Sequence, residues 1–122
     1  MHKIVSAIAL VLLLLGNAQA GEWEPREEAI KNLASGYAFM VLCSINGDAQ
    51  TAPVARLGEA YLSRMTKGAY EKFRDQYQRS LHEKTMYSIA SKKWVPFKVA
   101  ATECGTVDRS VDMYLQRLTN VP

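Results

Sequence analysis

The chain has 122 residues, of which 48% are hydrophobic and 22% are charged, and its net charge at pH 7 is +3. This length favours one domain with a modest core. The charge is too small to indicate nucleic acid or another polyanion as a partner.

The first twenty residues have the three parts of a secretory signal peptide. A basic start is followed by an apolar run over residues 4–15, and residues 18–20 form an Ala-x-Ala cleavage site before Gly21. The run is about twelve residues, shorter than the roughly twenty that a membrane-spanning helix needs. We therefore expect export to the periplasm and a mature single domain over residues 21–122 that does not span the membrane.

Two helices are predicted in the first half of this domain. Pro25 and the acidic residues around it suit a helix start. Apolar residues then recur at intervals of three and four at Ile30, Leu33, Ala34, Tyr37, Val41 and Ile45. A turn is expected at residues 46–48, and the apolar face of the next helix carries Val54, Leu57, Tyr61 and Met65.

The second half continues with the same helical spacing. Thr66 is a candidate cap for a third helix, whose apolar face carries Tyr70, Phe73, Tyr77 and Leu81 and whose spacing extends to Met86 and Ile89. A break is predicted at residues 92–97, because Pro96 disfavours helical angles at Val95. The last helix carries Ala100, Cys104, Val107, Val111, Tyr114 and Leu118, with a bend at residues 105–106. No alternating strand pattern is found, so the sequence predicts an all-α, compact bundle of four to five helices.

Cys43 and Cys104 are the two cysteines of the chain. An even number in an oxidising compartment favours a disulfide over a metal site or a reactive thiol. The bond would close a loop of about sixty residues and contribute roughly 4 kcal/mol to the free energy of unfolding.

Residues that would carry catalysis are nearly missing. His82 is the single histidine after residue 20, and neither a zinc-protease motif nor a serine-hydrolase elbow is present. We predict no catalytic residue, no metal site, no cofactor and no enzymatic activity.

The segment with Lys92, Lys93, Trp94 and Phe97 combines cations with large apolar side chains beside a proline. This composition is typical of interface anchors, so these four residues are the candidate partner-binding site. In the alternative, Trp94 and Phe97 close one end of the bundle. The tyrosines on the helical faces likewise suit a core, or a ligand cavity between helices.

Two short segments carry a resemblance to a known family. Tyr37-Ala38 followed by Leu42-Cys43-Ser44-Ile45, and Cys104 followed by Asp112-Met113-Tyr114-Leu115, are similar to segments of periplasmic immunity proteins that neutralise type VI secretion amidase effectors. The resemblance implies a small helical protein, often a homodimer, that holds a secreted amidase toxin inactive without catalysing a reaction. The middle of the chain departs from that pattern, and no binding residue is carried over.

These observations favour an exported protein-binding module that acts as an immunity or inhibitor protein against a toxin or cell-wall hydrolase. Two alternatives remain open, a periplasmic carrier of a small apolar ligand and an assembly accessory of an envelope complex.

Overall fold

The computed structural model describes residues 21–121, and the predicted signal peptide, residues 1–20, lies outside the described residues. The elements follow in the order α2 (Glu27–Ile45), α3 (Thr51–Arg64), α4 (Lys67–Glu83), β1 (Thr85–Ser88), β2 (Lys93–Pro96), α5 (Ala101–Cys104) and α6 (Val107–Leu118). The described part of the chain is therefore mostly helical, with one small antiparallel sheet.

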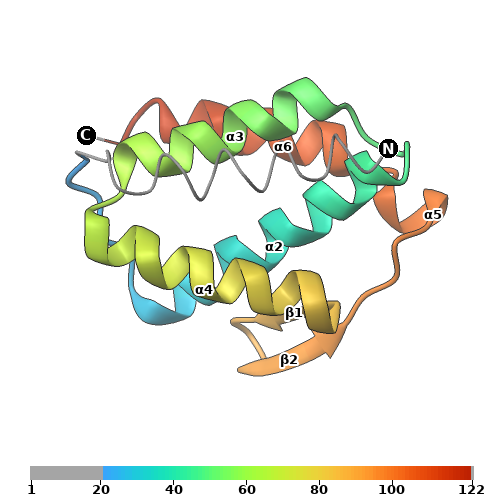
Figure 1. The fold of residues 1–122 in the computed structure, drawn as a ribbon, viewed down its shortest axis with the longest axis horizontal. Coiled ribbons are helices and arrows are strands. Elements are labelled where there is room, and N and C mark those ends of the chain that lie inside the picture. Colours follow the sequence, from blue (N-terminus) through green and yellow to red (C-terminus); the bar gives the residue numbers. More distant parts are fainter. Residues whose placement is uncertain (1–20, 122) are drawn as a thin grey trace.

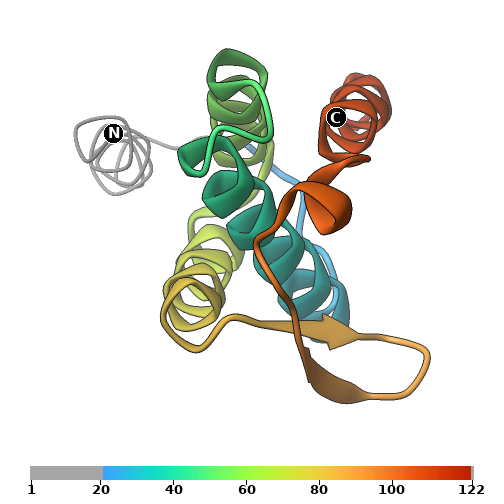
Figure 2. The same cartoon turned by 90° about the vertical axis from the view of Figure 1, so that its right-hand side faces the viewer.

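Helix α2 lies at the centre of the arrangement, as Figures 1 and 2 show. Helices α3 and α4 pack against it, and α6 packs mainly against α3. The β1–β2 hairpin lies against α2 on the side opposite α3 (Figure 2). Since α2 contacts nearly every other element, its segment 37–43 is apolar on all sides, as expected for an enclosed helix.

The helix ends follow the expected local signals. Thr66 accepts a hydrogen bond from the Ala69 amide at 3.1 Å and so caps α4, as predicted. Gly47, with a φ of 87°, lies in the turn that follows α2. The Asp108 carboxylate in the first turn of α6 accepts a hydrogen bond from the Gln50 amide at 2.9 Å, which joins the starts of α3 and α6.

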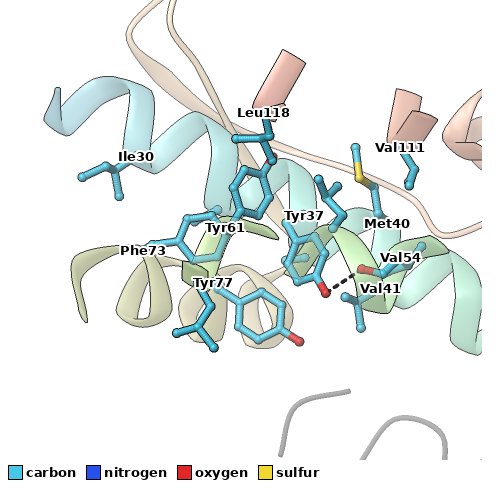
Figure 3. Close-up of a cluster of buried hydrophobic side chains, with 14 of the residues drawn as sticks. Ile30, Tyr37, Met40, Val41, Val54, Tyr61, Phe73, Tyr77, Val111 and Leu118 are labelled. Carbon is cyan, nitrogen blue, oxygen red and sulfur yellow. Dashed lines mark hydrogen bonds between the residues drawn. The ribbon is translucent and has the colours of Figure 1, made fainter. Parts of the chain in front are cut away.

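A cluster of aromatic side chains forms the centre of the core (Figure 3). Its members are 2% exposed or less: Tyr37, Tyr61, Tyr70, Phe73 and Tyr77. The Tyr61 and Phe73 rings lie 4.9 Å apart, and the Tyr37 hydroxyl donates to the Val54 carbonyl at 3.0 Å. These tyrosines are therefore core residues, and Tyr61 also lines a small pocket.

The predicted disulfide between Cys43 and Cys104 is confirmed. It joins α2 to α5 across 61 residues of sequence, and both cysteines are buried. Helix α6 begins three residues after Cys104, so the bond also fixes the start of the last long helix.

The prediction of an all-α fold is wrong for residues 85–96, which form the hairpin. The third helix does not extend to Met86 and Ile89, because Lys84 adopts the left-handed conformation (φ 56°) and ends α4. Strands of four residues contain too few alternations for a period of two to be recognised. The helical spacing of Met86 and Ile89 was therefore coincidental.

Candidate functional site

The hairpin is held in place by side chains of α2. Tyr87 of β1 donates its amide hydrogen to the Ser35 hydroxyl at 2.9 Å, and its carbonyl accepts from the Asn32 amide group at 2.8 Å. Ser35 in turn donates to the Lys31 carbonyl at 2.7 Å. Two α2 side chains thus satisfy the outward main-chain groups of Tyr87, as a third strand would in a larger sheet.

The inner face of the hairpin is aromatic. Tyr87 and Trp94 are opposite one another in the register, with ring centres 5.2 Å apart. The Arg79 guanidinium of α4 lies 4.3 Å from the centre of the Trp94 ring, and the Lys31 ammonium lies 5.3 Å from that of Tyr87. Stacking between cations and aromatic rings therefore attaches the hairpin to both α4 and α2.

The outer face of the hairpin is apolar and open to solvent. Successive side chains of a strand point to opposite faces of the sheet. The paired residues Met86 and Val95 therefore lie on the side opposite Tyr87 and Trp94. Val95 is 47% exposed, and Ile89 in the connecting turn is 44% exposed. A groove of about 530 Å³ lies here, with Met86, Val95 and Phe97 among its lining residues.

Positive charge surrounds this face. Residues 84–98 contain four lysines and no acidic residue, and the four are exposed: Lys84, Lys92, Lys93 and Lys98. The ion pairs found within residues 21–121 are Arg74–Asp75 and Arg79–Glu83, so none involves these lysines. We call the exposed residues Ile89 and Val95, the half-buried residues Met86 and Phe97, and the four lysines the hairpin surface.

The structure brings the four predicted binding residues together on one hairpin but divides them between its sides. Lys92 and Lys93 are exposed at the turn and the start of β2. Trp94 lies in a strand rather than a loop, and it is half-buried against Tyr87 and Arg79. Phe97 is half-buried, with its ring 5.0 Å from that of Phe39.

Sequence reasoning missed Met86, Ile89 and Val95, because it placed the first two on a helix and treated the third only as the residue before Pro96. The signal that could have found them is the Ser-Lys-Lys sequence at residues 91–93, a polar segment between two short β-prone runs.

Within residues 21–121 no three potential metal ligands come together, and His82 is exposed. Burial raises the pKa of Tyr70 to about 12 and the pKa values of the other core tyrosines, Tyr37, Tyr61 and Tyr77, well above their usual value. These hydroxyls are therefore neutral at physiological pH.

Among the described helices, none has both the length and the apolar composition needed to cross a membrane. Comparisons with protein-family models, with curated proteins and with solved structures found no match for this chain. The resemblance to immunity proteins stays a prediction that rests on its two short segments.

Proposed function

We propose that this protein binds an acidic protein partner through the hairpin surface and acts in the periplasm as an inhibitor or immunity protein. The observation that carries the proposal is the exposed apolar face of the hairpin, surrounded by four lysines without ion pairs. An apolar centre with a polar, charged rim is the usual composition of a protein interface.

The contacts that hold the hairpin against the helices favour binding by its surface. Ser35 accepts a hydrogen bond from Tyr87 and Asn32 donates one to it, and these bonds, with the contact of Arg79 with Trp94, hold the hairpin against two helices. A preorganised surface loses little conformational entropy when it binds, so more of the contact energy remains as affinity.

The charge of the surface indicates the chemistry of the partner. Four lysines within fifteen residues attract carboxylates and repel a second copy of the same surface. An acidic partner is therefore favoured over self-association through the hairpin. The resemblance to immunity proteins suggests that this partner is a secreted cell-wall amidase.

Site-specific crosslinking tests the proposal. A photoreactive amino acid at Val95 should capture one acidic protein in the periplasm, and the same group at Met113 is the matched control. Met113 is 40% exposed on α6, similar to the 47% exposure of Val95. Equal capture from both positions, or none from Val95, would contradict binding through the hairpin.

The purified partner then allows the role of the surface to be measured. We expect Val95→Ser to weaken binding by about 1–2 kcal/mol, roughly five- to thirtyfold, and Met113→Ser to leave affinity unchanged. Reversing the charges of Lys92 and Lys93 should slow association and remove its salt dependence. If the partner hydrolyses peptidoglycan, an equimolar amount of this protein should stop the reaction. A captured partner without hydrolytic activity would instead support the envelope-assembly alternative.

A further inference from the structure

A second, smaller pocket lies away from the hairpin, where both ends of the described chain meet α3 and α6 (Figure 1). Its walls come from the N-terminal segment, three helices and the C-terminal tail, through residues that include Trp23, Leu33, Tyr61, Leu118 and Val121. Trp23 is fixed there because its amide donates to the Arg64 carbonyl at 2.7 Å and its carbonyl accepts from the Thr66 amide at 2.9 Å.

The pocket has a volume of about 200 Å³, and its lining is largely apolar. Pockets for drug-sized ligands have volumes of roughly 300–1,000 Å³. This pocket is smaller and therefore suits a smaller ligand group, such as one aromatic ring or a short acyl chain. An apolar wall holds water poorly. An apolar group is the better occupant.

Arg117 and Tyr61 are among the residues that line this pocket. Arg117 is exposed at its edge, with the guanidinium 5.8 Å from the centre of the Tyr114 ring and in neither of the described ion pairs. Tyr61 is 1% exposed. Figure 3 shows the Tyr61 side chain pointing toward Leu118, which also lines the pocket.

We infer that this pocket binds a small carboxylic acid whose apolar body lies between Trp23, Leu33 and Leu118. The carboxylate pairs with the Arg117 guanidinium, because an unpaired cation at the edge of an apolar pocket is complementary to an anion with an apolar tail. This site is separate from the hairpin surface and does not depend on the proposed function.

Phenylacetate and its uncharged analogue 2-phenylethanol are the probes that test this inference. Each is titrated into the purified protein and followed by two-dimensional NMR at the signals of Trp23, Leu33 and Val121. We expect phenylacetate to shift these signals and to bind about fivefold more tightly than 2-phenylethanol, the effect of a partly exposed ion pair.

Arg117→Gln should remove the preference for the acid while leaving the binding of 2-phenylethanol unchanged. Arg109→Gln is the matched control, since Arg109 is an exposed arginine on the same helix that does not line the pocket. Equal binding of the two probes by the unmodified protein would overturn the assignment to carboxylic acids. Absence of shifts at the pocket signals with both probes, or shifts confined to the hairpin, would overturn the site itself.

Discussion

Ser35 connects the helical core to the hairpin through a single hydroxyl group. It is fully buried on α2, and it accepts from the Tyr87 amide while donating to the Lys31 carbonyl. A serine in the middle of a helix is usually neutral or unfavourable. Here the Ser35 hydroxyl takes the place of a neighbouring strand. It stabilises the fold through its hydrogen bond with Tyr87, which lies 52 positions away in the sequence.

Ser35→Ala should lower the free energy of unfolding by about 1–3 kcal/mol, because the Tyr87 amide would remain buried without an acceptor. Urea unfolding followed by circular dichroism measures the change. Ser63→Ala is the control: Ser63 is an exposed serine on α3 that donates to the Ala60 carbonyl, and its loss should change stability by less than about 0.5 kcal/mol. Similar losses for the two variants would show that Ser35 has no special role.

Tyr37 and Tyr77 offer a second comparison between residues of the same type. Both are buried, but the Tyr37 hydroxyl donates to the Val54 carbonyl, whereas that of Tyr77 has no partner among the described residues. Tyr37→Phe should therefore cost about 1 kcal/mol, and Tyr77→Phe should be neutral or stabilising. Thermal unfolding measures the stability of the two variants relative to the unmodified protein. The reverse order of stabilities would contradict the hydrogen-bond assignment.

At the scale of the elements, the predictable features were those with local signals. The turn after α2, the cap at Thr66 and the restart of a helix near Asp108 were found because each depends on residues a few positions apart. The hairpin was missed because its strands are short and because Ser35 and Asn32, which hold it, lie more than fifty residues earlier. For the same reason the sequence identified the basic, aromatic segment of the candidate site but not its exposed apolar face.

Lys84 is the residue that separates α4 from β1, and its left-handed conformation is one that glycine adopts more easily. We expect Lys84→Gly to stabilise the protein by about 0.5–1 kcal/mol, provided that the helix still ends there. The urea midpoint measures this gain. Lys93→Gly, at an extended position of the same hairpin, should destabilise it instead. Shifts of the same sign in both variants would exclude backbone strain at Lys84 as the cause.

For the whole molecule, the disulfide is the strongest single constraint on the arrangement. Cys43 lies near the end of the central helix, and Cys104 lies at the end of α5, just before the helix that covers α3. The bond therefore determines where α6 begins relative to the rest of the core.

Replacing both cysteines by serine should lower the free energy of unfolding by about 2–5 kcal/mol, since the unfolded chain is no longer crosslinked. For a domain of this size each kcal/mol corresponds to roughly 4–8 °C in Tm, so the change is easily seen by calorimetry. A reducing agent should lower the Tm of the unmodified protein and leave that of the double variant unchanged. A Tm of the unmodified protein that does not respond to the reducing agent would contradict this assignment.

The covalent loop closed by the disulfide has a practical consequence for the hairpin. Lys92 and Lys93 are exposed at the tip of the hairpin, where trypsin can cut. This position lies between Cys43 and Cys104 in the sequence. A single nick there leaves two fragments that migrate as one species until the disulfide is reduced. The hairpin can thus be opened by limited proteolysis in an otherwise intact molecule, and the binding of the nicked form compared directly with that of the uncut protein.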